Sequence, residues 1–217
     1  MKNAKGLGWV FVLALVLILL ASSLGCAAAH LATPTPRGLV IELAEAEEKG
    51  LVEAEIVGRD LDWIDLVLES LTPDPLEVTI PIGTLFEAQS SGTQNMVVLE
   101  NSSVFLEMEG SREPVVLRVA CANMALHIPD EEDQFIVSRS TVPDDLIQLL
   151  NLPEFHEAGS FVKQFAIWTI TDNPPRDGYR GLGYFGVGYP PDEDDLEAIR
   201  TLFEEAGITT ENYQALR

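Results

Sequence analysis

Cysteine is nearly absent from this sequence of 217 residues, which contains only Cys26 and Cys121. Two cysteines exclude the multiple-disulfide framework that stabilises many small exported domains. If Cys26 is modified or lost with the N-terminus, Cys121 has no disulfide partner in the chain, which indicates a reactive or intermolecular thiol. The alternative is an inert, buried Cys121 that packs as a small apolar side chain.

Basic residues are also scarce, with 13 Lys and Arg against 35 Asp and Glu. Loss of Lys2 and Lys5 with an N-terminal leader leaves 11 against 35, a net charge of about −24. Such a charge argues against nucleic acid and anionic lipid headgroups as partners. An apolar fraction of 47% argues against disorder.

The sequence lacks the motifs HExxH, DxDxDG and a Gly-rich phosphate loop, so we expect no metal ion and no cofactor. The acidic side chains of the strand-like stretches alternate with apolar ones, which favours a solvated strand face over a metal site.

The N-terminus has the order of a secretory signal: Lys2 and Lys5, the apolar run 9–20, and then small residues. The run is shorter than a comfortable membrane span. Cys26 follows Leu24-Gly25, which resembles the lipobox of bacterial lipoproteins. We therefore expect a lipoprotein-type signal peptide at 1–25, lipidation of Cys26 and a Thr/Pro tether at 26–37.

Two alternatives to lipidation remain open at this end of the chain. Ala27-Ala28-Ala29 offers a signal-peptidase site, and an uncut segment would be a membrane anchor. In each case the rest of the chain is extracytoplasmic, and in the favoured case it is anchored in the cell envelope.

The first half of the remaining chain has a strand pattern. Apolar and polar residues alternate in 63–71 and 76–80, on either side of the turn 72–75. Further short strands are predicted at 51–57, 84–88, 96–99, 104–108 and 115–120. A helix at 43–49, ended by Gly50, precedes them. This spacing predicts an antiparallel β-sandwich over 38–120.

The second half changes to a helical pattern. Helices are predicted at 144–150, 161–173 and 192–206, with Ser160 as the N-cap of the second, and a glycine-aromatic loop is predicted at 179–189. We therefore predict an α+β fold, an N-terminal antiparallel β-sandwich followed by a mainly helical region over 121–217.

The segment 161–173, FVKQFAIWTITDN, is apolar on nearly all sides, which is typical of a buried helix. It carries Gln164, whose amide requires hydrogen-bond partners if it is buried. A neighbouring backbone group is one candidate partner, and Cys121 is the other.

Cys121 together with Gln164-Phe165-Ala166-Ile167-Trp168 resembles the thioester domains of bacterial surface proteins. In that family a Q-x-A-I-W helix supplies a glutamine that forms an internal thioester with an earlier cysteine, and amines open it. The resemblance implies a thioester between Cys121 and Gln164, shielded by Phe161, Phe165 and Trp168. The family's T-Q-x-A motif is not carried over, because Thr93-Gln94-Asn95-Met96 lies before Cys121 and has Met for Ala.

Three functions are compatible with these residues. The first is covalent attachment of a lipid-anchored surface protein to an amine-bearing ligand, without turnover. The second is non-covalent binding by the same fold, with Cys121 and Gln164 only packed together. The third is a thiol hydrolase with Cys121 as nucleophile and His127 or His156 as base. We rank them in that order and expect an adhesion protein rather than an enzyme.

Overall fold

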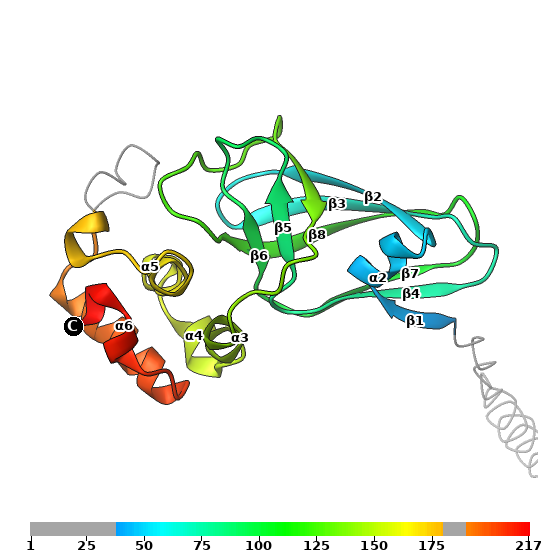
Figure 1. The fold of residues 1–217 in the computed structure, drawn as a ribbon. Helices are drawn as coiled ribbons and strands as arrows, with labels where there is room; N and C mark the ends of the chain where they lie inside the picture. Colours follow the sequence, from blue (N-terminus) through cyan, green and yellow to red (C-terminus); the bar gives the residue numbers. More distant parts are fainter. Residues whose placement is uncertain (1–37, 180–189) are drawn as a thin grey trace, which may run out of the picture. The chain divides into compact units, whose positions relative to one another are not determined.

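The structure is a computed structural model that describes residues 38–179 and 190–217 (Figure 1). The predicted signal peptide, Cys26 and the tether 26–37 lie outside the described residues, as does most of the glycine-aromatic segment. Within the described part, no helix combines the length and the apolar character needed to cross a membrane.

A closed barrel is the main β-structure, with strand order β2–β3–β8–β6–β5–β9. All of its neighbouring strands are antiparallel. The alternation in β3 places Ile64, Leu66 and Leu68 in the core without exposed surface. The strands are β2 (Val52–Gly58), β3 (Trp63–Ser70), β5 (Leu85–Ala88), β6 (Met96–Val98), β8 (Arg112–Cys121) and β9 (Gln134–Val137).

A smaller sheet has the order β1–β4–β7 and mixes both strand directions. Strand β1 (Leu39–Glu42) is parallel to β4 (Leu76–Ile80), and β7 (Ser102–Leu106) is antiparallel to β4. Helix α2 (Leu43–Glu48) continues directly from β1 and ends before Gly50, whose φ of 65° suits a glycine. The sheet contacts the barrel through β7, which lies against β3 and β8.

In the described part of the chain, four α-helices follow the barrel in sequence (Figure 1). Helix α5 contacts β8, α3 and α6, so its side chains from Lys163 to Ile170 are all buried. This confirms the prediction of a buried helix for the part from Lys163 to Ile170. The helices are α3 (Asp144–Leu150), α4 (Pro153–Glu157), α5 (Ser160–Thr171) and α6 (Glu193–Glu205), with short 3₁₀ turns η1 (Arg176–Tyr179), η3 (Thr210–Asn212) and η4 (Gln214–Leu216).

The helix starts differ in their capping. Helix α6 begins with a capping box, in which the Asp192 side chain accepts from the Asp195 N–H and the Asp195 side chain accepts from the Asp192 N–H. The predicted N-cap of α5 is wrong by one residue: Gly159 is the N-cap, and Ser160 is already helical.

The predicted fold class is wrong. The sequence pattern predicted a β-sandwich followed by a mainly helical half, whereas the structure is rich in β-strands and its main sheet closes into a barrel. Strand β9, which lies in the second half of the chain, pairs with both β2 and β5 and closes that barrel. Alternation shows which residues face inward but not which strands pair, so closure could not be read from it.

Candidate functional site

Cys121 is the last residue of β8 and has no exposed surface. Its cross-strand neighbour in β6 is Met96. The next residue, Ala122, donates its N–H to the Asn95 carbonyl at 2.7 Å. In an antiparallel ladder, the main-chain groups of adjacent residues point to opposite sides. The N–H and C=O of Cys121 therefore point away from β6.

The side-chain amide of Gln164 pairs with the main chain of Cys121. Gln164 Nε2 donates to the Cys121 carbonyl oxygen at 2.7 Å, and the Cys121 N–H donates to Gln164 Oε1 at 3.2 Å. Gln164 is only 4% exposed, so these two bonds satisfy an amide that water does not reach freely. The two residues predicted to form one site lie in direct contact.

This pairing occupies a position where β8 has lost its other neighbour. The ladder between β3 and β8 extends from Glu69↔Arg112 to Trp63↔Arg118, and the Val119 N–H then reaches the carbonyl of Asp62 at 2.9 Å. Beyond that point the strand β3 no longer accompanies β8. The amide of Gln164 thus supplies Cys121 with the donor and acceptor that a neighbouring strand would have supplied.

A second bond fixes α5 to the same segment. The Asp172 carboxylate, at the C-terminal end of α5, accepts from the Met124 N–H at 3.0 and 3.1 Å to its two oxygens. Burial raises the pKa of Asp172, which these bonds oppose. Helix α5 is therefore attached at both Cys121 and Met124, which holds the amide of Gln164 in register with the strand.

The thiol of Cys121 is in a poor environment for a thiolate. Burial raises its pKa, and the negative charge of Asp62 raises it further. The thiol is therefore protonated at neutral pH, unlike the activated cysteines of thiol enzymes, which lie in electropositive and partly exposed surroundings.

The three aromatic residues predicted to shield the site differ in burial. Phe165 and Trp168 are 1% and 0% exposed, and their ring centroids lie 5.8 Å apart. Phe161 stacks on Phe165 at 6.4 Å but is 54% exposed. Phe161 therefore lies at the surface end of an aromatic row whose inner members are enclosed. Within the described part of the chain, the indole N–H of Trp168 has no hydrogen-bond partner.

The two histidines considered as bases have other contacts in the structure. The Nε2 atom of His156 lies 2.8 Å from the Leu150 carbonyl oxygen, and its own carbonyl accepts from Lys163 Nζ at 3.4 Å. The main chain of His127 bonds with the 92–94 segment, where its N–H donates to Gly92 and its carbonyl accepts from Gln94. These contacts do not assemble a cysteine–histidine pair.

Sequence reasoning missed two residues near the site. Lys163, beside Gln164, is 9% exposed, and burial lowers its pKa. A lysine in the middle of an apolar helix is a signal that could have identified it. Gln94 has no exposed surface; its Nε2 donates to the Leu126 carbonyl at 3.0 Å, and its Oε1 has no partner among the described residues. The segment Thr93-Gln94 was not assigned to the T-Q-x-A motif, because it precedes Cys121 and is followed by Met where the motif has Ala. It nevertheless leads directly into β6, which pairs with β8 at Cys121.

In the ranges 38–179 and 190–217, no group of three or more His, Cys, Asp or Glu side chains is placed to hold a metal ion. No protein-family model, curated protein or solved structure matches the chain. The function must therefore be argued from the geometry of Cys121 and Gln164.

Proposed function

We propose that this protein is exported and anchored in the cell envelope through its N-terminus, and that it attaches covalently to amine-bearing ligands. The reactive bond is a thioester between Cys121 Sγ and the side-chain carbonyl carbon of Gln164. The observation that supports this most is the pair of hydrogen bonds between the Gln164 amide and the Cys121 main chain. It holds the acyl group beside the residue that carries the thiol.

The hydrogen bonds also suit the chemistry. The Cys121 N–H donates to Gln164 Oε1, where negative charge develops when sulfur attacks the carbonyl carbon. The C–S bond forms, the C–Nε2 bond breaks, and ammonia leaves with the proton of the thiol. The reaction is unfavourable in water, so the enclosure of both side chains favours the product by excluding hydrolysis.

Capture of a ligand reverses the roles of the groups. A primary amine attacks the thioester carbon, Cys121 regains its thiol and proton, and Gln164 becomes a secondary amide joined to the ligand. The reaction occurs once per molecule, as suits attachment rather than catalysis. The strongly negative chain favours cationic amine-bearing surfaces over anionic ones.

One observation favours a second candidate, non-covalent binding with an unreacted pair. The two hydrogen bonds already satisfy both polar atoms of the Gln164 amide, so the fold does not require a covalent bond there. Hydrolysis by a cysteine nucleophile is less favoured, because His156, one of the two candidate bases, is bonded to the Leu150 carbonyl instead of Cys121.

Intact mass spectrometry separates the two candidates. The wild-type chain and Cys121→Ala, purified in parallel under acid quench, differ by one sulfur atom if no thioester forms. They differ by one sulfur less one ammonia if it does. Any processing at the N-terminus is common to both chains and cancels in the difference.

We expect the smaller difference. Methylamine should then add its own mass to the wild type and leave Cys121→Ala unchanged, and Gln164→Glu, which lacks the amide, should show no loss of ammonia. A difference of one whole sulfur atom, with a thiol that titrates after unfolding, would contradict the covalent proposal and favour non-covalent binding.

A further inference from the structure

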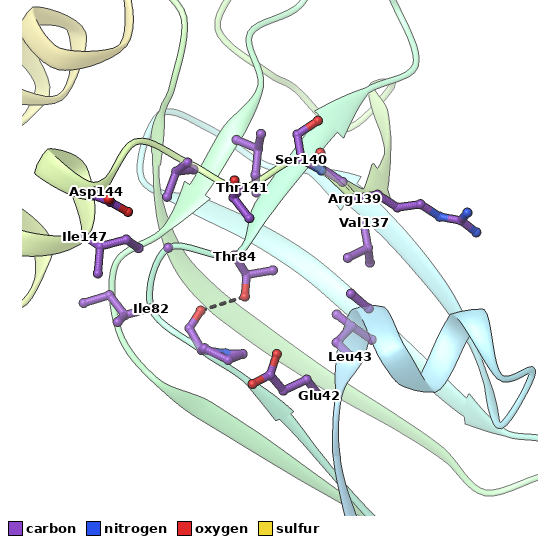
Figure 2. Close-up of a pocket in the computed structure, with 16 residues that line it drawn as sticks. Glu42, Leu43, Ile82, Thr84, Val137, Arg139, Ser140, Thr141, Asp144 and Ile147 are labelled. Carbon is purple, nitrogen blue, oxygen red and sulfur yellow. Dashed lines mark hydrogen bonds between the residues drawn. The ribbon is translucent and has the colours of Figure 1, made fainter.

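A pocket of about 400 Å³ lies away from the Cys121–Gln164 pair, between α2 and α3 (Figure 2). Neither of those two residues lines it. Its walls come from the junction of β1 and α2, the 81–85 loop, the 137–142 segment and the start of α3. We call it the α2–α3 pocket. Its volume is in the range of small-ligand sites, which extends from about 300 to 1,000 Å³.

The wall formed by the 81–85 loop is fixed in place. Gly83 has a φ of 84°, and a Cβ there would lie 2.3 Å from Ile147 Cδ1 in α3. The Gly83 N–H donates to the Val98 carbonyl at 2.9 Å, and Thr84 Oγ1 donates to the Pro81 carbonyl at 2.7 Å. The pocket is therefore formed before any ligand arrives, which lowers the entropic cost of binding.

Arg139 distinguishes this pocket from the rest of the acidic surface. Among the residues that the structure describes, it is the only Lys or Arg without a hydrogen bond or ion pair from its side chain. Its charge acts on Glu47 in α2 without an ion pair between them. In a chain with 35 acidic residues, a cation left unpaired beside a pocket is available to a carboxylate from outside.

The opposite charge lies across the pocket. Figure 2 shows Asp144 and Arg139 on opposite sides of the view, with Thr84 and Thr141 between them. Asp144 and Glu42, which also lines the pocket, have no hydrogen bond or ion pair from their carboxylates within the described residues. The lining also includes the apolar side chains of Leu43, Ile82, Leu85, Val137, Val142 and Ile147.

We propose that the α2–α3 pocket binds a short apolar peptide with free termini. Its carboxylate pairs with Arg139, its ammonium group faces Asp144, and its side chains contact the apolar side chains that line the pocket. The hydroxyls of Ser140 and Thr141 are available to the peptide amides.

Calorimetry with the full-length Cys121→Ala chain in detergent tests this, with the tripeptide Ala-Leu-Ala as the probe, because the amino group of the probe would open a thioester in the wild type. We expect a Kd on the order of 0.1–1 mM, since a small ligand on a preformed site gains little beyond its ordering cost. N-acetylation or C-amidation of the probe should each weaken binding by about tenfold, because each removes one charge pair.

Matched variants keep the test specific. Arg139→Gln should weaken the free peptide about tenfold and leave the C-amidated peptide unchanged, while Arg59→Gln, a surface arginine elsewhere, should have no effect. Asp144→Asn should weaken binding of the peptide that has a free amino terminus. Asp194→Asn, which also replaces an acid in the first turn of a helix, should not change that binding. The proposal would be overturned if the N-acetylated and C-amidated peptides bound as tightly as the free peptide, or if no binding occurred at millimolar peptide.

The pocket and the thioester can fail separately. Cys121→Ala cannot form the thioester, so its binding of Ala-Leu-Ala should not depend on what the mass measurement of the wild type shows. Absence of peptide binding in Cys121→Ala would contradict a separate site.

Discussion

At the scale of single residues, Gln164 is central both to the stability of the fold and to the proposed reaction. Its amide is the only described side chain that pairs with both main-chain groups of Cys121. A buried main-chain group that loses its partner costs about 1–3 kcal/mol, because water cannot replace the bond. The residue is therefore important for stability whether or not it reacts.

This gives a stability prediction. Gln164→Ala should lower the free energy of unfolding by about 2–5 kcal/mol, the sum of two lost partners and a small cavity. Gln148→Ala, an exposed glutamine in α3, is the matched control and should change it by less than about 0.5 kcal/mol. Urea unfolding followed by circular dichroism measures both. An equal loss in the two variants would show that the Gln164 bonds contribute little.

The arrangement of Arg139 belongs to the same scale, but nothing in the sequence pointed to it. An arginine between two serines in an irregular segment has no period and no motif. Its significance depends on which carboxylates are distant from it, which only the folded chain determines.

At the scale of elements, α5 is the best-predicted part of the chain. Its apolar residues required burial, and a buried glutamine required a hydrogen-bond partner, so these two features followed from the sequence. The choice of Cys121 came only from the family resemblance, and the groups that bond to the Gln164 amide are the main-chain groups of Cys121. Strand β9 was not predicted, because Ile136 points outward and is 51% exposed, which hides the alternation of Phe135 and Val137. Phe161 had the helical spacing of a buried residue but lies near the exposed end of α5.

The contact between α5 and η1 predicts a pH dependence. Tyr179 and Thr169 share a hydrogen bond at 2.6 Å. Burial raises the pKa of Tyr179 from 10.0 to about 12, against the effect of that bond. Because the folded pKa is the higher one, its contribution to stability is complete below pH 10 and is lost as the pH rises toward 12.

The substitution Tyr179→Phe should therefore lower the free energy of unfolding by about 1 kcal/mol at neutral pH. Between pH 10 and 12 the free energy of unfolding of this variant should fall less steeply with pH than that of the chain with Tyr179. Both chains should carry Cys121→Ala, so that alkaline hydrolysis of a thioester does not interfere. Tyr213, whose pKa burial also raises, keeps part of the slope. An unchanged slope in Tyr179→Phe would show that this phenol does not titrate with unfolding.

At the scale of the whole molecule, charge is the dominant feature. The chain has 13 basic against 35 acidic residues, so most carboxylates have no cation to pair with. The ion pairs that do form are largely exposed, such as Lys49–Glu45 and Arg112–Glu55, and exposed pairs contribute about 0–1 kcal/mol each. Repulsion among carboxylates should outweigh them.

Salt should therefore stabilise this protein. Raising NaCl from about 10 mM to about 500 mM shortens the screening length to a few ångströms and weakens the repulsion. We expect the Tm to rise by several degrees, since about 1 kcal/mol shifts it by about 2–4 °C in a domain of this size. Differential scanning calorimetry measures the shift. A falling Tm would mean that the ion pairs outweigh the repulsion.

Because the Gln164 amide pairs with the Cys121 main chain, the two ways of opening a thioester there would leave products of different stability. A thioester opened by a primary amine leaves a secondary amide, which keeps one N–H to donate to the Cys121 carbonyl. A thioester opened by water leaves a carboxylate, which can only accept and would face that carbonyl oxygen at close range. The form that has captured an amine would keep the native hydrogen bond, whereas the hydrolysed form would be destabilised. Hydrolysed molecules would therefore unfold more readily than molecules that have captured a ligand.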